Sequence, residues 1–160
     1  MQRPRSAGWP ILLGAMFLAY LVSTAFAAML TFEFIHFDVH DQLIENPHVH
    51  GLTAENLTRI FTSRCVTSYY PVRSLTYALD YHVWGLNPRG FKFTNLLLHM
   101  ANVLLVFWLI LRFQRHPAAI GRSPGTWREA AVAAFSAGIF AVHPVVVEPV
   151  VWVPGREELL

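Results

Sequence analysis

An apolar run from Trp9 to Met29 contains no charged side chain. About 20 residues at roughly 1.5 Å per residue are enough to cross the hydrocarbon core of a bilayer. Arg3 and Arg5 precede the run, and basic residues favour the cytoplasmic side of a membrane. We therefore predict that residues 1–30 form a first transmembrane helix with a cytoplasmic amino terminus. The alternative is a cleaved signal peptide, because Ala25-Phe26-Ala27 resembles a cleavage site.

Two later apolar stretches predict two more spans. Residues 94–113 form the second span, and residues 130–160 contain the third span and an outer segment. The connection at residues 114–129 has three arginines and one glutamate, which indicates a cytoplasmic basic loop. Because both charge patterns agree, we expect residues 31–93 to form a long outer loop.

The composition fits a protein whose surroundings are largely lipid. Hydrophobic residues make up 54% of the chain and charged residues 14%, whereas an ordinary soluble domain carries about 25% charge. The formal net charge is only +2, and the basic residues cluster beside the spans, so we expect no nucleic-acid partner. A single cysteine, Cys65, cannot form an internal disulfide. The sequence predicts an all-α polytopic membrane protein with about three transmembrane helices.

Two amphipathic helices are predicted in the outer loop. Thr53 can cap a helix over residues 54–62, with Leu57, Ile60 and Phe61 on one face. Pro71 suits the first position of a second helix. Its apolar residues form two stripes, one of Val72, Leu75, Leu79 and Val83 and one of Tyr77, Tyr81 and Trp84. We expect both helices to lie on the membrane surface; the alternative is a small soluble subdomain.

Polar side chains within or beside the spans need a reason, because they are costly in lipid. Asn95, His99 and Asn102 follow one another at spacings of four and three, which puts them on one helix face. They either form hydrogen bonds between helices or line a polar cavity. His143 and Glu148 flank the outer end of the third span, where they face either water or a protein cavity.

The segment from His36 to Asp41 follows the first span directly. In an extended backbone His36, Asp38 and His40 would project to the same face. Two imidazoles and a carboxylate could hold a divalent metal, with His48 or His50 as a further ligand. No recognised zinc spacing is present, and we predict neither a metal nor a cofactor. The alternative role for Asp38 is that of a general base that removes a proton from a substrate hydroxyl.

A series of short motifs occurs in a fixed order along most of the chain. They are Phe34-Ile35-His36-Phe37-Asp38, Glu45-Asn46-Pro47-His48-Val49, Tyr70-Pro71, Leu79-Asp80-Tyr81, Trp84-Gly85-Leu86-Asn87-Pro88, Thr94-Asn95-Leu96-Leu97-Leu98-His99, His143-Pro144, Val147-Glu148, Val151-Trp152-Val153 and Gly155-Arg156. In these motifs the chain resembles a family of membrane glycosyltransferases. The family comprises bacterial tetratricopeptide-repeat membrane proteins and the animal transmembrane and tetratricopeptide repeat O-mannosyltransferases.

The resemblance implies a GT-C fold with many membrane helices and a catalytic acid in the first outer loop. It also implies a polyprenyl-phosphate sugar donor and a protein acceptor with a Ser or Thr hydroxyl. Asp38 matches the first acid of the family's acidic pair, whereas the second acid falls at Val39, which leaves Asp41 as its candidate replacement. Because such proteins continue into a helical repeat region, we expect this chain to be an amino-terminal piece of a larger protein.

We therefore hypothesise that the chain is part of a membrane enzyme that transfers a sugar, mannose, with Asp38 as the base. An arginine must offset the charge of the lipid phosphate, and guanidinium matches phosphate geometry. The candidate substrate-binding residues are Arg73, Arg89, Arg156 and Glu148. The alternative function is a non-catalytic membrane scaffold or binding protein that acts through its outer loop. The Arg-rich, Lys-poor composition favours a bacterial inner membrane over the endoplasmic reticulum membrane of a eukaryote.

Overall fold

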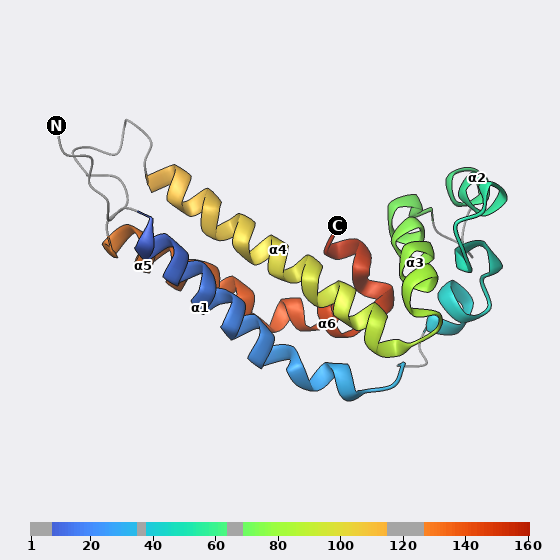
Figure 1. The fold of residues 1–160 in the computed structure, drawn as a ribbon, viewed down its shortest axis with the longest axis horizontal. Helices are drawn as coiled ribbons and strands as arrows, with labels where there is room; N and C mark the ends of the chain where they lie inside the picture. The colour runs from blue at the N-terminus through green and yellow to red at the C-terminus, as the bar shows by residue number, and fades with distance from the viewer. Residues whose placement is uncertain (1–7, 35–37, 64–68, 115–126) are drawn as a thin grey trace. The chain divides into compact units, whose positions relative to one another are not determined.

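The computed structural model describes residues 8–34, 38–63, 69–114 and 127–160, and every regular element in these ranges is helical (Figure 1). The α-helices are α1 (Trp9–Phe26), α2 (Ala54–Thr62), α3 (Pro71–Trp84), α4 (Pro88–Gln114), α5 (Trp127–Ala141) and α6 (Val147–Val151). The short 3₁₀ segments are η1 (Ala27–Thr31), η3 (Pro47–Val49), η4 (Pro144–Val146) and η5 (Val153–Glu158), and η2 (His40–Ile44) is one turn of π-helix. The protein is therefore all-α, as the sequence predicts.

Two described helices are long and apolar enough to cross a membrane. They are Trp9–Thr31, which joins α1 to η1, and Pro88–Gln114, which is α4. A third candidate consists of α5 together with Pro144–Val151, if the two parts are counted as one span. The chain is thus a polytopic membrane protein with two or three spans. Helix α4 starts six residues before the boundary predicted at Thr94, because Asn87 caps it and Pro88 occupies its first position.

The chain forms two compact units. The first contains Met1–Ala25 and His99–Val146, and the second contains Phe26–Leu98 and Val147–Leu160. The cytoplasmic loop predicted between the second and third spans lies mostly outside the described residues, as do Arg3, Arg5, His36 and Cys65.

Small residues let the helices of the first unit approach closely. A Cβ added to Gly14 of α1 would lie 2.9 Å from the Phe107 ring of α4. Helix α5 buries a row of small residues, namely Ala130, Ala133, Ala134, Ala137, Gly138 and Ala141. His99 adds a polar contact, since its Nε2 lies 2.9 Å from the carbonyl oxygen of Ala141. Close packing of small residues with a few hydrogen bonds is typical of helices in lipid.

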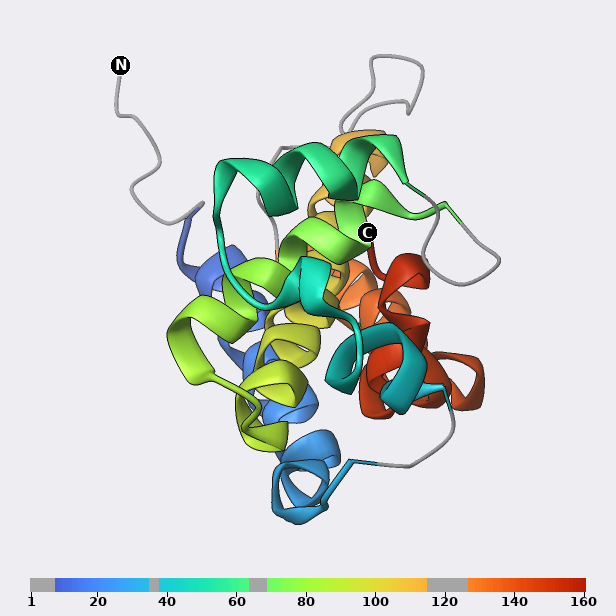
Figure 2. The same ribbon diagram turned by 90° about the vertical axis from the view of Figure 1, so that its right-hand side faces the viewer.

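The second unit contains α2, α3, the first turns of α4 and the C-terminal segment; α2 and α3 (green) face the viewer in Figure 2. Its core consists of Val39, Leu43, Val49, Tyr77, Phe91 and Val153. These residues come from four separate stretches of sequence, so the core joins residues of the predicted outer loop to the C-terminal segment. Both outer helices lie where the sequence predicts them, with Thr53 Oγ1 accepting a hydrogen bond from Asn56 N at 3.1 Å.

The predicted apolar faces of these helices are only partly buried. In α2, Ile60 is buried and Phe61 is half exposed. In α3, Tyr77 is buried, whereas Leu79 and Val83 are exposed. Spacing along a helix predicts which residues share a face, but not which face packs against the rest of the protein.

Candidate functional site

Asp38 lies at a sharp turn of the backbone. Its φ angle is +58°, which makes it the one non-glycine residue with positive φ among the described residues. Asp is one of the few side chains that tolerate this left-handed region. The Asp38 carboxylate is exposed, and its carbonyl oxygen accepts a hydrogen bond from Gln42 N at 3.1 Å. The first acid proposed for catalysis is therefore accessible at the start of η2.

The extended backbone on which a shared face of His36, Asp38 and His40 would depend does not occur in the described part of this segment. Val39 has helical backbone angles, and the chain from His40 to Ile44 forms a π-helical turn. Asp38 and His40 therefore do not project to one face of a strand, as a metal site with His36 would require. His36 lies outside the described residues. Within the described ranges no group of three or more His, Cys, Asp or Glu side chains could hold a metal ion.

Burial of the Val39 side chain stabilises the turn at Asp38. Val39 is 1% exposed and packs in the core of the second unit with Leu43, Tyr77 and Phe91. Val39 stands where the resemblance implies a second acid, so an apolar side chain occupies this position. Asp41, the candidate replacement, is exposed on η2. One turn thus presents two carboxylates to the surface while the residue next to Asp38 anchors the backbone.

Lys92 binds the backbone just after η1, a role that no motif in the sequence indicated. Its Nζ donates hydrogen bonds of 2.8 Å to the carbonyl oxygens of Phe32 and of Glu33, and the residue is 1% exposed. A buried lysine needs such partners because desolvating its charge is costly. The signal in the sequence was that the chain's only lysine stands between Phe91 and Phe93.

Arg156 is the most completely buried charged residue in the described part of the chain, at 0% exposure. Its Nη2 lies 2.7 Å from Asp80 Oδ2, and its Nε donates to Asn95 Oδ1 at 2.6 Å. It also donates to Thr76 Oγ1 at 3.1 Å and to the carbonyl oxygen of Phe91 at 2.8 Å. With this many partners, the guanidinium stabilises the fold and has no surface open to a substrate.

Asp80 completes this polar cluster inside the second unit. Thr94 Oγ1 donates a hydrogen bond of 2.6 Å to Asp80 Oδ1. Burial raises the pKa of Asp80, while the charge of Arg156 and the hydrogen bonds from Thr94 and Arg156 oppose that rise. Asn95 extends the cluster, because its Nδ2 donates to the carbonyl oxygens of Pro149 and Val150. The sequence left two alternatives for the polar face of α4: hydrogen bonds to other helices, or a polar cavity. Asn95 and His99 form hydrogen bonds to other segments.

Arg73 is also buried and paired. Its Nη1 lies 2.9 Å from Glu157 Oε2 and 3.3 Å from the carbonyl oxygen of Pro154. Its guanidinium carbon lies 4.6 Å from the centre of the Tyr70 ring. Two of the three candidate arginines thus attach the C-terminal segment to α3.

Arg89 differs from the other two candidates because it is exposed on the first turn of α4. Within the described ranges its side chain has no hydrogen-bond or ion-pair partner. It lines a groove of about 300 Å³ together with Leu30, Trp84, Asn87, Gly90 and Phe93. A volume near 300 Å³ is at the lower end of the range for small-molecule sites. Glu148, the remaining candidate, is exposed in α6.

Gly90 shapes this groove through its missing side chain. A Cβ at position 90 would lie 2.3 Å from Trp84 Cγ, a distance that real Cβ atoms do not reach. The glycine therefore lets the indole ring lie against the first turn of α4, where it meets Phe93 edge to face at 6.3 Å between ring centres. The position of the Trp84 ring, which lines the groove, therefore depends on a glycine at position 90.

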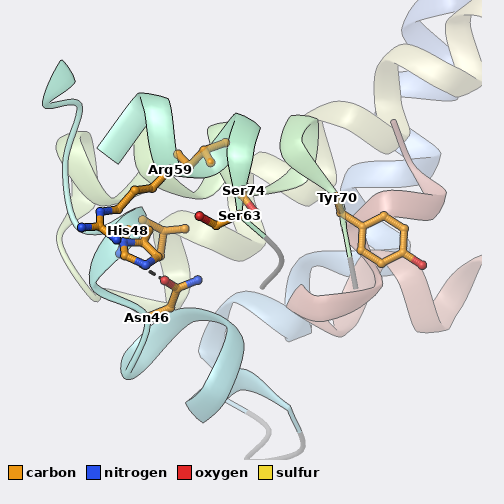
Figure 3. A pocket seen from close by; sticks show the side chains of 8 residues that line it. Asn46, His48, Arg59, Ser63, Tyr70 and Ser74 are labelled. Atoms are coloured by element: carbon orange, nitrogen blue, oxygen red, sulfur yellow. Dashed lines mark hydrogen bonds between the residues drawn. The ribbon is translucent and has the colours of Figure 1, made fainter. Parts of the chain in front are cut away.

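A second, more polar pocket lies among η3, α2 and the start of α3 (Figure 3). Its volume is only about 20 Å³. A space of that size holds about one water molecule, so it excludes a sugar ring. Asn46, His48 and Arg59 lie close together in Figure 3, where Asn46 Oδ1 accepts a hydrogen bond from His48 N at 3.1 Å.

Comparison with known proteins gives related sequences in several animals. The chain is 38% identical over 100 residues to protein O-mannosyl-transferase Tmtc3 of Drosophila melanogaster, an alignment covering 58% of this chain. It is 33% identical over 121 residues to protein O-mannosyl-transferase TMTC2 of Mus musculus, covering 74% of this chain. It is 33% identical over 110 residues to TMTC4 of Homo sapiens, covering 64%.

The chain belongs to the TMTC family of protein O-mannosyl-transferases. The alignments span only 11%, 13% and 14% of the length of these TMTC relatives. No protein-family model matches the chain, and no solved structure does. The relatives are named as transferases, which agrees with the class of enzyme implied by the ordered motifs.

Proposed function

We propose that this TMTC chain is part of a GT-C type membrane glycosyltransferase. The enzyme moves a sugar, mannose, from a polyprenyl- or dolichyl-phosphate donor to a Ser or Thr hydroxyl of a protein acceptor. The names of the relatives support transfer of mannose to protein, and the apolar spans support a donor that resides in the membrane. We propose that the reaction takes place on the non-cytoplasmic side, in a bacterial inner membrane or, in a eukaryote, the endoplasmic reticulum membrane.

The observation that carries this proposal is the exposed Asp38 carboxylate at a left-handed turn. Unusual backbone angles cluster at active sites, where the surrounding structure maintains them. Here Val39 anchors one side of the turn in the core, and Lys92 binds the chain at Phe32 and Glu33 on the other. Asp38 removes the proton from the acceptor hydroxyl as that oxygen attacks the anomeric carbon of the sugar. The bond between that carbon and the phosphate oxygen breaks, and the polyprenyl phosphate leaves. Asp41 supplies the second carboxylate that the family's acidic pair would provide.

Arg89 is the arginine that we assign to the donor phosphate. Its guanidinium is exposed and has no partner within the described ranges, whereas Arg73 and Arg156 are buried and paired. The apolar lining of its groove suits the first carbons of a prenyl chain, with the phosphate at the polar rim. Arg73 and Arg156 contribute to the site indirectly, because they hold the C-terminal segment against α3. Glu148, also exposed, remains a proposed contact to the substrate.

The proposal is tested by Asp38→Asn in the full-length protein, reconstituted with a polyprenyl-phosphate mannose donor and an acceptor peptide. Asparagine keeps the size of aspartate and tolerates positive φ, but cannot take a proton at neutral pH. The rate of mannose transfer should fall by about 10²- to 10⁴-fold, with no change in the amount of folded protein. Transfer at the wild-type rate would refute the assignment and favour the scaffold alternative. Asp41→Asn shows whether the second carboxylate contributes.

The role of Arg89 is tested separately with Arg89→Gln. Loss of the phosphate contact should raise the KM for the donor and leave the KM for the acceptor peptide unchanged. Arg59→Gln is the matched control, because Arg59 is exposed on α2 and pairs there with Glu55 at 3.1 Å. Equal effects of the two substitutions would remove Arg89 from the donor site.

A further inference from the structure

Helix α3 buries its Arg and Asp side chains and exposes several apolar side chains, unlike a helix that faces water. Its Arg73 and Asp80 side chains are both buried, at 3% and 5% exposure, and its one histidine, His82, is exposed in the last turn. Its exposed side carries Val72, Leu79 and Val83, which are 56%, 47% and 65% exposed. These three residues are spaced by seven and four, so they form one stripe along the helix.

The neighbouring helix α2 exposes a different set of side chains. In α2 the charged residues Glu55 and Arg59 are exposed and paired with each other, while the apolar Ile60 is buried. This is the ordinary arrangement of a surface helix in water. Both helices belong to the same unit, so their opposite orientation reflects different surroundings for their outer sides.

The connection to α4 keeps α3 near the membrane surface. Helix α3 ends at Trp84 and the membrane-spanning helix α4 begins at Pro88, which leaves three residues between them. Three residues reach at most about 10 Å. The headgroup layer on each side of the hydrocarbon core is about 5–8 Å thick. A helix attached this closely to a span lies at the depth of the headgroups. At that depth an apolar stripe is stable, whereas the same stripe facing water would be unfavourable.

We infer that α3 lies in the plane of the membrane interface, with Val72, Leu79 and Val83 in contact with lipid acyl chains of the outer leaflet. We assign lipid as the partner of this face because the exposed side of α3 carries no Asp, Glu, Lys or Arg. Such side chains would form ion pairs with a protein partner or be hydrated in water. Trp84, exposed at the end of the helix, is a residue type enriched at membrane interfaces. The inference does not depend on the proposed enzymatic activity.

The test uses single cysteines labelled with an environment-sensitive fluorophore in the full-length protein, with Cys65 replaced by serine, in lipid nanodiscs. Labels at Leu79 and Val83 report on α3, and labels at Glu55 and Thr58 on the exposed side of α2 are the matched controls. Quenching by lipids brominated on their acyl chains should be several-fold stronger on α3 than on α2. Quenching by aqueous iodide should show the reverse order.

Two results would overturn the inference. Strong iodide quenching at Leu79 and Val83, equal to that on α2, means that the stripe faces water. Protection of both positions from iodide and from brominated lipid means that another part of the protein covers the stripe. A label at Val72 gives a third independent position if either of the other two variants fails to fold.

Discussion

Arg156 and Asp80 form a buried ion pair in which Arg156 Nη2 lies 2.7 Å from Asp80 Oδ2. The pair joins η5, near the C-terminal end of the chain, to α3. Neither residue is open to solvent, so each needs the other for its charge to be balanced. The same contact brings Asn95 and Thr94 of α4 into one hydrogen-bonded cluster.

Removing either partner of this pair should strongly destabilise the second unit. We expect Arg156→Met and Asp80→Asn each to lower the free energy of unfolding by about 3–5 kcal/mol, because the remaining group loses its buried partner. Arg59→Met, which breaks the exposed pair with Glu55, should cost less than about 1 kcal/mol. Denaturant unfolding of the three variants in detergent micelles measures the difference. Similar small losses in all three would contradict the structural role of Arg156.

Gly90→Ala should destabilise the protein even though alanine is the better helix former. The propensity gain in a helix is about 1 kcal/mol, whereas overpacking of the Trp84 ring typically costs about 1–3 kcal/mol. Gly138→Ala is the matched control, because its nearest neighbour, Leu21 Cδ2, would lie 3.6 Å from the new Cβ. We expect Gly138→Ala to be neutral or stabilising. Thermal unfolding midpoints that move in the same direction for both variants would show that Trp84 does not restrict position 90.

Val39→Asp should not restore a working acidic pair. Position 39 is buried in the core, so the new carboxylate would be desolvated without a partner. We expect a loss of about 1–3 kcal/mol in the free energy of unfolding from the buried polar group, with no increase in transfer rate. Ala54→Asp, at the exposed start of α2, should change stability by less than about 0.5 kcal/mol. A faster enzyme with unchanged stability would mean that position 39 reaches the surface.

The predicted topology is checked by labelling cysteines in intact cells. With Cys65 replaced by serine, Ala54→Cys in the outer loop should react with a membrane-impermeant maleimide. Arg122→Cys in the predicted cytoplasmic loop should react only after the cells are permeabilised, because basic loops stay inside. The topology is wrong if both positions react, or both are protected, in intact cells.

Local signals in the sequence were sufficient for the helices of the outer loop. The side chain of Thr53 caps α2 and Pro71 starts α3, because capping and the fixed φ of proline depend on a few neighbouring residues. The apolar run starting at Trp9 was equally sufficient for a membrane helix, since length and hydrophobicity alone decide whether a helix can span a bilayer. The ordered motifs in turn led to the TMTC family.

The same local signals failed between Asp38 and Asp41. An alternating pattern of four to six residues fits a strand and an irregular turn equally well. The turn forms because Val39 and Leu43 both pack in a core whose other members, such as Tyr77 and Val153, are distant in sequence. No pattern within the segment contains that information.

The all-α membrane class and the family could be predicted from the sequence alone, and so could the positions of α2 and α3. Only the tertiary structure separated the three arginines that the sequence treated as equivalent. Arg73 and Arg156 bind Glu157 and Asp80 inside the second unit, whereas Arg89 stays exposed. The physical reason is that an arginine's role depends on whether a carboxylate and carbonyl groups from distant segments surround it, and distant segments meet only when the chain folds.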